Sequence, residues 1–345
     1  MSTVDFALAC PAPLGRHTTI QLAHGGGGRL TRELIEGLFL PTFDSASLRQ
    51  RHDSAVLPIG GAMLAFTTDS YVVQPRFFPG GDIGKLAVFG TVNDLAMAGA
   101  RPLYLSAGFI LEEGLALDEL RRVADSMREA ARSCGVELVT GDTKVVDRGK
   151  GDGIFVNTAG VGVVPDGVVI SPKRIQPGDA VLISGDVGRH GIAVLSVRKG
   201  LEFESPIESD CAPLSPLVAA LVAAGIDIHC LRDATRGGLA TALNELATDA
   251  SVSVEVEESS IPVSDGVTGA CELLGLDPLY VACEGRMVAL LPETHVGRAL
   301  EALGTTARRI GTVGKGPSGM VTLKTRMGSS RLLDLLSGEQ LPRIC

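Results

Sequence analysis

Glycine is the residue type that most constrains how this chain folds. The sequence holds 43 glycines among 345 residues, well above the usual share of roughly 7%. They stand singly or in short groups at the ends of apolar runs, not in low-complexity tracts. Glycine lets a backbone turn sharply or approach a ligand closely. The pattern predicts many short loops lining a site, as in proteins that hold polyphosphates.

Length and composition favour two globular domains. At roughly 150 residues per domain, 345 residues correspond to two, and 45% hydrophobic with 21% charged residues excludes disorder as the overall state. No apolar run approaches the roughly 18 residues of a membrane helix, so no membrane partner is expected. The net charge of −9 disfavours nucleic acid as the main partner.

The cysteines and the N-terminus indicate a cytoplasmic protein. Seven cysteines are scattered without a C-x-x-C pair, which indicates neither a disulfide framework nor a zinc site. Residues 1–20 resemble a weakly ordered leader and lack the basic start and apolar core of a secretory signal. We therefore expect a reduced chain in the cytoplasm.

Apolar periodicity predicts helices and strands in both halves. A helix is expected after the glycine run, through Phe39 and ending before Pro41. Further helices are predicted at 84–98, 117–134, 191–199, 215–224 and 238–249, and strands at 63–68, 103–110, 136–140, 154–164, 180–184, 252–256, 279–283, 287–291 and 319–324. Several strands follow one another without an intervening helix, so the pattern favours an α+β fold of two mixed domains.

The turn-rich stretch 171–179 is the best domain boundary. We expect a leader at 1–20, an N-terminal domain at 21–170, a C-terminal domain at 171–330 and a flexible tail at 331–345. The tail contains Gly338 and ends in Cys345, a thiol that such a hinge could move between an internal site and partners.

Acidic residues recur at predicted strand ends and glycine turns, namely Asp53, Asp69, Asp82, Asp94, Asp142 and Asp233. Magnesium prefers carboxylate and phosphate oxygens, and glycine amides can cradle phosphate. The set therefore points to Mg²⁺ bridging a triphosphate, although the Walker A, G-x-G-x-x-G, G-x-S-x-G and H-E-x-x-H motifs are absent.

The alternative for each single aspartate is a turn or helix cap. Asp82, placed to cap the helix that follows it, is the clearest case. Asn93 lies three helical turns beyond it, at a distance of about 16 Å. The two would contact different parts of a long nucleotide or serve different protomers.

Four motifs resemble the aminoimidazole ribonucleotide synthetase-like (PurM-like) superfamily. They are Gly80–Gly84, Asn93–Ala100, Gly141–Lys144 and Asp233–Gly238. Within it, the chain resembles the HypE family of hydrogenase maturation proteins, through His24–Gly28, Thr67–Val73, Cys283–Gly285 and the terminal Pro342–Cys345. The match covers nearly all of residues 20–345, and the C-terminal motif is the most specific part.

The resemblance implies a carbamoyl dehydratase that uses ATP and Mg²⁺. Its terminal cysteine would receive a carbamoyl group from the carbamoyltransferase HypF and be converted to S-cyanate. The cyanide would pass to iron on a HypC–HypD complex, for the active site of [NiFe]-hydrogenase. A homodimer is also implied, with the N-terminal domain binding ATP and forming the dimer core.

Residue roles follow from this match. Cys345 would carry the group, Glu284 would act as base, and Lys144 would orient the amide or balance phosphate charge. Nucleotide contacts would come from Asp53, Asp69, Asp82, Asn93, Asp94, Asp142, Asp233 and the run Gly25, Gly26, Gly27 and Gly28, a candidate lid over the phosphates. The metal would be held by Asp69, Asp94, Asp142 and Asp233.

Plainer interpretations of these residues stay open. Glu284 fits an exposed turn residue about equally well. Lys144 could be a surface lysine paired with Asp142 or Asp147, and the glycine run could be a flexible start of the helix that follows it. The other cysteines are expected to be small core residues, and among the histidines only His52, beside Asp53, is singled out.

Two other functions remain as alternatives. One is a small-molecule ATP phosphotransferase of the same fold, indifferent to the tail. The other is a nucleotide-gated scaffold that binds ATP without turnover and tolerates Cys345→Ser.

Overall fold

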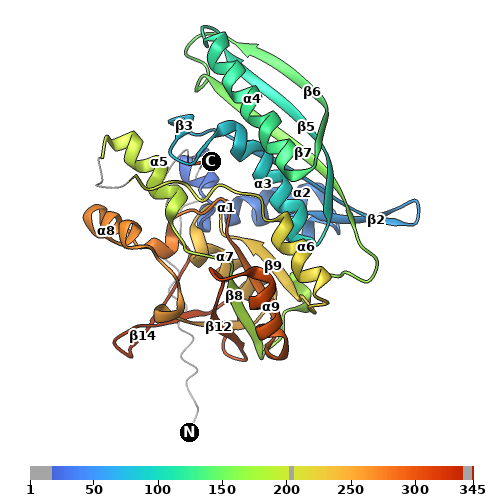
Figure 1. The fold of residues 1–345 in the computed structure, drawn as a ribbon, viewed down its shortest axis with the longest axis vertical. Helices are drawn as coiled ribbons and strands as arrows, with labels where there is room; N and C mark the ends of the chain where they lie inside the picture. The colour runs from blue at the N-terminus through green and yellow to red at the C-terminus, as the bar shows by residue number, and fades with distance from the viewer. Residues whose placement is uncertain (1–17, 202–205, 337–343) are drawn as a thin grey trace.

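The computed structural model describes residues 18–201, 206–336 and 344–345. They form two α/β units, each built on one mixed sheet (Figure 1). Residues 1–17 of the predicted leader at 1–20 lie outside the described residues, as do 337–343 of the predicted tail. The turn-rich stretch 171–179 connects the two sheets.

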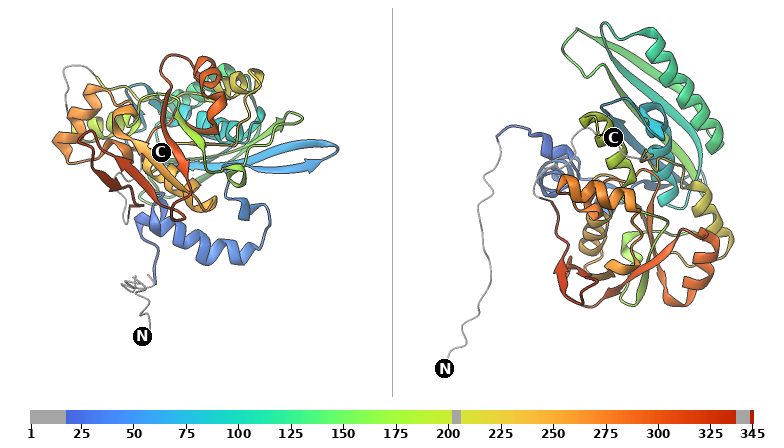
Figure 2. Two further views of the ribbon diagram at one scale, coloured as in Figure 1. Left: turned by 90° about the horizontal axis from the view of Figure 1, so that it is seen from below. Right: turned by 60° about the vertical axis from the view of Figure 1, so that its left-hand side comes forward.

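The N-terminal sheet has five strands in the order β1-β2-β7-β5-β6, of which only β5 and β6 are parallel. Its strands are β1 (Ala55–Ile59), β2 (Ala62–Tyr71), β5 (Arg101–Glu112), β6 (Glu137–Val146) and β7 (Ile154–Val164). A small hairpin is formed by β3 (Phe77–Phe78) and β4 (Gly81–Asp82). The β1–β2 hairpin projects from the body of the molecule (Figure 2).

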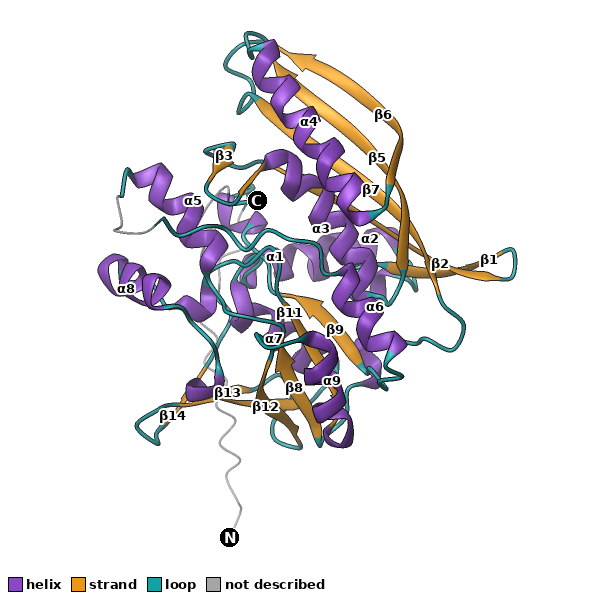
Figure 3. Ribbon diagram, viewed as in Figure 1, coloured by secondary structure: helices purple, strands orange, loops and turns teal. Residues whose placement is uncertain are grey.

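Helices cover one face of this sheet, as Figure 3 shows. Helix α3 (Ile83–Met97) is buried over nearly its whole length, whereas α4 (Leu117–Cys134) packs through Val123, Met127 and Ala131. Their spacing of four residues places these side chains on one stripe of α4. The predicted helix 117–134 is confirmed at both ends.

The C-terminal sheet has seven strands in the order β14-β13-β10-β12-β8-β11-β9. Its strands are β8 (Asp179–Ile183), β9 (Cys230–Asp233), β10 (Ser253–Glu257), β11 (Met287–Pro292), β12 (Arg308–Gly314), β13 (Val321–Lys324) and β14 (Ser330–Leu332). Its helices are α5 (Arg189–Lys199), α6 (Ser215–Ala223), α7 (Gly238–Asp249), α8 (Asp265–Leu274) and α9 (Val296–Leu303).

The end of α3 joins the two units. Ala96 and Met97 are fully buried in one apolar cluster with Leu182, Leu231 and Met287 of the C-terminal sheet. Burying this surface favours one fixed arrangement of the two units. The packing of these apolar side chains therefore fixes the position of the two units relative to each other.

A strand was predicted at 279–283, and this prediction is wrong. Pro278–Tyr280 forms a 3₁₀ turn, and the Asp277 carboxylate caps it by accepting a hydrogen bond from the Leu279 amide at 3.0 Å. The following apolar residues are buried in an irregular segment, where the Cys283 amide donates to the Ala234 carbonyl. Periodicity cannot separate a short buried strand from such a segment.

The prediction that the first helix ends before Pro41 is also wrong. Helix α1 (Arg29–Leu34) continues through a π-helical turn (Ile35–Phe39) into α2 (Leu40–Phe43). Pro41 lies at the start of α2, directly after the π-helical turn, in which the Leu40 amide bonds the Ile35 carbonyl. The chain thus continues as a helix past a residue that has no N–H to donate.

Two boundaries differ as well. Strand β6 extends to Val146, so Asp142 lies inside a strand and not at its end. At the C-terminus, β14 pairs with β13 and Leu333 is buried, so the folded domain extends past the predicted tail start at residue 331.

Candidate functional site

A cavity of about 570 Å³ lies between the two units. Its walls come from the glycine run and α1, the inner face of β2, helix α3, the loop after β9 with the start of α7, and the C-terminal residue. Among the lining residues are His24, Gly25, Gly27, His52, Asp53, Thr67, Asp69, Tyr71, Gly90, Asp94, Arg232, Asp233, Arg236, Glu245, Glu284 and Cys345. Residues distant in the sequence therefore meet here.

Three carboxylates meet at one end of the cavity. Oxygen atoms of Asp53, Asp94 and Asp233 all lie within 4.8 Å of one another. Asp53 precedes β1, Asp94 stands on the last turns of α3, and Asp233 ends β9. Thr67 Oγ1 donates to Asp94 Oδ2 at 3.0 Å, and Arg232 Nε lies 3.1 Å from Asp53 Oδ1.

The charges of this cluster are poorly compensated. Burial raises the pKa of Asp94 and of Asp233 well above the usual value, and repulsion among the neighbouring carboxylates adds to the effect. Asp53 Oδ2 is buried without a hydrogen-bond partner among the described residues. An all-oxygen donor set with an unpartnered buried oxygen fits a hard divalent cation such as Mg²⁺.

The predicted metal set is thus met in part. Asp94 and Asp233 belong to the cluster, and Asp53, predicted only as a nucleotide contact, joins them. Asp69 lines the same cavity but bonds the Ser70 amide and lies 3.8 Å from Arg236 Nη2. Asp142 lies elsewhere, as shown below.

The last two residues of the chain are anchored inside the cavity. The Val72 amide donates to a main-chain oxygen of Cys345 at 3.3 Å, and the Ile344 carbonyl lies 2.8 Å from His190 Nε2. Burial lowers the pKa of His190 to about 4, so its neutral ring donates from Nε2. Its Nδ1 then accepts from Ser209 Oγ at 2.9 Å.

The Cys345 thiol lies among ionisable groups. Burial raises its pKa well above the usual value, the nearby Arg236 guanidinium lowers it, and the Glu284 carboxylate raises it again. Glu284 is only 4% exposed, and its Oε1 has no hydrogen-bond partner among the described residues. Burial and neighbouring aspartates raise the pKa of Glu284 too, which gives a base close to the thiol. The interpretation of Glu284 as an exposed turn residue is wrong.

The glycine run closes one end of the cavity against Arg236. Gly27 adopts a φ of +76°, and a Cβ there would lie 3.0 Å from the Arg236 carbonyl oxygen, so only glycine allows this approach. Arg236 Nη1 also donates to the Gly25 carbonyl at 3.3 Å. Gly26 and Gly28 flank these contacts without lining the cavity. That the run acts as a lid stays a prediction.

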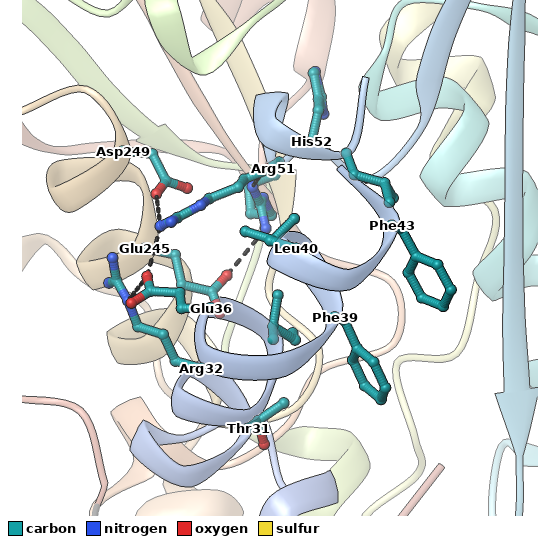
Figure 4. Close-up of a pocket in the computed structure, with 13 residues that line it drawn as sticks. Thr31, Arg32, Glu36, Phe39, Leu40, Phe43, Arg51, His52, Glu245 and Asp249 are labelled. Atoms are coloured by element: carbon teal, nitrogen blue, oxygen red, sulfur yellow. Dashed lines mark hydrogen bonds and ion pairs between the residues drawn. The ribbon is translucent and has the colours of Figure 1, made fainter. Parts of the chain in front are cut away.

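A second pocket of about 490 Å³ adjoins the cavity, between the helices α1–α2 and α7 (Figure 4). Phe39, Leu40 and Phe43 give it an apolar wall. Its opposite wall carries ion pairs from Arg51 Nη1 to Glu36 at 2.7 Å and to Asp249 at 3.1 Å. The two spaces share the lining residues Thr31, Ile35, Phe39, His52, Arg232 and Glu245.

Besides Gly26 and Gly28, the predicted nucleotide contacts Asp82, Asn93 and Asp142 do not line the cavity. Asp82 Oδ1 accepts from the amides of Gly84 and Lys85 at the start of α3, and its Oδ2 accepts from Ser126 Oγ. Asn93 is buried and bonds the backbone of Ala212 and Leu214. In this structure Asp82 caps a helix and Asn93 joins the two units.

Asp142 and Lys144 are not brought into the cavity of their own chain. Strand β6 is the edge strand, three strands from β2, or about 14 Å. The register aligns Ser70, Asn157, Gly108 and Asp142 in one row. Because strand residues alternate between faces, this row lies on the opposite face of the sheet from Asp69. Lys144 lies two residues after Asp142 in β6 and therefore on the same face as Asp142.

Sequence reasoning missed three residues of the site. Arg236, which faces the thiol, stood in a quoted motif but received no role. His190 and Tyr71 belong to no metal or nucleophile pattern. A lone buried histidine or tyrosine gives no sequence signal, because its surroundings come from distant segments: His190 bonds the Ile344 main chain, and Tyr71 meets Gly90 and Cys345 in the cavity.

Other cysteines are poor candidates for the nucleophile. None of the six described cysteines forms a disulfide, and Cys10 lies outside the described residues. Cys283 is fully buried and its sulfur accepts from the Gly188 amide at 3.2 Å, so the interpretation as a core residue holds for it. No helix in the described part of the chain is long and apolar enough to span a membrane.

Comparison with known proteins gives the family. The model for the N-terminal domain of AIR synthase related proteins matches residues 51–164, and that for the C-terminal domain matches residues 176–324. Carbamoyl dehydratase HypE of Azotobacter vinelandii is 52% identical over 335 residues, 96% of this chain and 98% of that protein. HypE of Escherichia coli K12 is 45% identical, covering 94% of this chain and 99% of that protein.

Solved structures agree with this. A crystal structure of HypE in complex with ATP has a TM-score of 0.80 and 51% identity, covering 95% of this chain and all of that one. A HypE–HypF complex has a TM-score of 0.83 and 46% identity, covering 88% of this chain and 99% of that one. The chain therefore belongs to the HypE family of carbamoyl dehydratases.

Proposed function

We propose that this chain, as an ATP-dependent carbamoyl dehydratase, acts on a carbamoyl group bound to its own Cys345 and converts it to S-cyanate. One observation carries the assignment of this thiol. The C-terminal residue is anchored inside the cavity, beside Glu284 and Arg236 and in the space lined by the aspartates. Its product would supply cyanide ligands for the iron of [NiFe]-hydrogenase.

The reaction balances with one ATP per group. The carbamoyl oxygen attacks the γ-phosphorus, forming an O–P bond as ADP leaves, and one proton leaves nitrogen. Loss of the second proton completes the C≡N bond while the C–O bond breaks and phosphate departs. Phosphoryl transfer thus turns a poor leaving group into a good one.

Side chains of the cavity suit these steps. Glu284, a carboxylate of raised pKa beside the sulfur, would take protons from nitrogen. Arg236 would hold negative charge near the thiol, since its guanidinium faces both Cys345 and Asp69. Desolvation strengthens both interactions in a buried site.

ATP would lie across the cavity with its phosphates toward the aspartates. Asp53, Asp94 and Asp233 would hold Mg²⁺, which supplies charge neutralisation to a polyphosphate. Gly25 and Gly27 would approach the phosphates, and Asp69 would lie on the same wall. The adjoining apolar pocket beside Phe39 is of a kind that suits a nucleotide base. The solved ATP complex of a relative supports the nucleotide.

A homodimer would bring the remaining predicted residues into use. The uncovered sheet face exposes Phe66, Tyr104 and Ile110, each about half exposed, and such apolar surface is typical of an interface. Packing this face against a second copy would cover it. Asp142 and Lys144, on the same face, would then serve the cavity of the partner chain.

Two further partners complete the proposal. A carbamoyltransferase of the HypF kind would load Cys345, supported by the HypE–HypF complex of a relative. A HypC–HypD complex would accept the cyanide. Because both are encountered outside the cavity, the tail would leave and re-enter it. We place these events in the cytoplasm.

Mass spectrometry of the C-terminal peptide tests the proposal. The chain is incubated with carbamoyltransferase, carbamoyl phosphate and ATP, and then with further Mg-ATP. We expect a carbamoyl adduct on Cys345 that loses one water in the second step. An unmodified Cys345 beside an active transferase would contradict the proposal.

The same assay separates the alternatives. If the chain were a small-molecule phosphotransferase, the wild-type chain and the Cys345→Ser variant would consume ATP equally well, measured as release of ADP. A nucleotide-gated scaffold would bind ATP without consuming it. Either result would contradict the assignment of this site as a carbamoyl dehydratase.

A further inference from the structure

The hydroxyl of Tyr71 is buried in the cavity without a satisfactory partner. Tyr71 is 2% exposed, and its oxygen has no hydrogen-bond partner among the described residues. The neighbouring Thr91 hydroxyl lowers the pKa of Tyr71; it bonds Thr158 Oγ1 at 2.6 Å and makes no hydrogen bond of good geometry with the Tyr71 oxygen. An unpaired buried hydroxyl costs stability, so a ligand acceptor is the natural explanation.

The sheet directs this side chain to the site. Thr67, Asp69 and Tyr71 alternate along β2 on the face that meets α3, because strand side chains have a period of two. All three line the cavity together with Glu284 and Cys345. The next amide, that of Val72 just after β2, donates to a main-chain oxygen of Cys345, so the backbone beside Tyr71 contacts the residue that carries the group.

Helix α3 leaves room for the hydroxyl through a glycine. A Cβ at Gly90 would lie 2.1 Å from the Tyr71 oxygen. Gly90 is one helical turn before Asp94, a member of the carboxylate cluster, and both line the cavity. Any larger residue at position 90 would displace the hydroxyl from its place.

The surroundings keep Tyr71 a donor. A phenol has an ordinary pKa of about 10, and the carboxyl groups of Asp69, Asp94 and Glu284 line the same cavity. The phenol therefore stays protonated among groups that are mainly acceptors. A neutral donor in such a place suits a ligand oxygen.

We propose that the Tyr71 hydroxyl donates a hydrogen bond to the oxygen of the carbamoyl group carried by Cys345. This inference rests on the proposed function. The bond orients the group and then stabilises the same oxygen as it departs with phosphate. Tyr71 transfers no proton and changes no covalent bond.

The test is Tyr71→Phe in the full-length chain, loaded by the carbamoyltransferase and followed in a single turnover with Mg-ATP. We expect loss of water from the Cys345 adduct to slow about 100-fold, the effect of removing one donor to a reacting oxygen. Loading of Cys345 and binding of ATP stay unchanged. The melting temperature stays equal or rises, because an unsatisfied hydroxyl is removed.

Tyr280→Phe is the matched control, since it removes a phenol that lies outside the cavity and bonds the Asp334 carbonyl, and it leaves the rate unchanged. A wild-type rate of dehydration in Tyr71→Phe would overturn the inference. It would also be overturned if the slower rate came with a lower melting temperature and weaker loading of Cys345, because the substitution would then have damaged the fold. If the wild-type adduct itself never loses water, the proposed function fails instead. The two failures are therefore distinct.

Discussion

The two faces of the N-terminal sheet differ in what covers them. The inner face, with Thr67 and Asp69 of β2, lies under α3 and lines the cavity. The outer face, with Ser70 and Asp142 in one row, is exposed in the single chain. One step along a strand thus separates a residue of the cavity from a residue of the open surface.

The difference shows that residues predicted from the sequence to form one site lie on two opposite faces of the sheet. The inner face lines the cavity together with Asp233, Arg236 and Cys345 of the same chain. Ser70 and Asp142 of the outer face are exposed and do not line the cavity in the described part of the chain. We infer that its charged residues work only when a second copy covers them.

The largest expected effect is at the inner site. Cys345→Ser should abolish cyanate formation while ATP binding persists, because the reacting sulfur is gone but the aspartates and glycine run remain. The measurement is single-turnover mass spectrometry combined with ATP titration. Cys134→Ser, a half-buried thiol outside the cavity, serves as control. Retained activity in Cys345→Ser would place the reaction elsewhere.

The carboxylate cluster is next. Asp233→Asn should lower dehydration by about 1,000-fold, because it removes one anionic ligand from a site that balances phosphate charge. It should also weaken the stabilisation of the folded chain by Mg²⁺, measured as the shift in melting temperature with added metal. Asp125→Asn, on the exposed surface of α4, should change neither. An unaltered response to Mg²⁺ would remove Asp233 from the metal set.

The pH dependence tests the base on the inner side. The pKa of Glu284 is raised, so its carboxylate is protonated at low pH and inactive as a base. The dehydration rate of the loaded chain should therefore rise with pH through that raised pKa, and Glu284→Gln should be slower by about 100-fold with this rise removed. A rate profile that Glu284→Gln leaves unchanged would contradict the role.

The outer face gives a smaller effect. Lys144→Ala should slow dehydration about 10- to 100-fold, the range of one charged group that orients a reactant, without altering carbamoyl loading. The measurement is the rate on the loaded chain. Lys150→Ala, in the turn after β6, is the matched control. Equal rates for the two variants would make Lys144 an ordinary surface lysine.

The smallest effect concerns Asp82. Asp82→Ala should lower the free energy of unfolding by about 1 kcal/mol, the usual cost of a lost helix cap, with little change in ATP affinity. Asp82→Asn keeps a capping oxygen and should restore stability. Chemical denaturation and nucleotide titration measure the two quantities. A marked loss of ATP affinity at unchanged stability would instead favour the nucleotide contact predicted from the sequence.

The sequence predicted the α+β class and most long elements, because α4 and the strands around Thr68 and Asn157 carry strong periodicity. It also placed Asp94, Asp233, Glu284 and Cys345 in one site through motifs. It could not place Asp142, since the length of β6 depends on pairing with β5 and not on local pattern.

Contacts between distant segments explain the other misses. Arg236 faces a thiol more than a hundred residues away, and His190 bonds the Ile344 carbonyl. The Tyr71 hydroxyl of β2 fits against helix α3 only because Gly90 has no side chain there. Such roles follow from packing of the two units, which no local pattern encodes.

Mixing two inactive variants tests most directly whether inner and outer faces meet across two copies. One chain carries Cys345→Ser, and the other carries Asp142→Asn with Lys144→Ala. If each site joins the inner face of one chain to the outer face of its partner, random exchange of subunits restores about a quarter of all sites. If instead each site is complete within one chain, the mixture stays as inactive as its two components, and the account is contradicted.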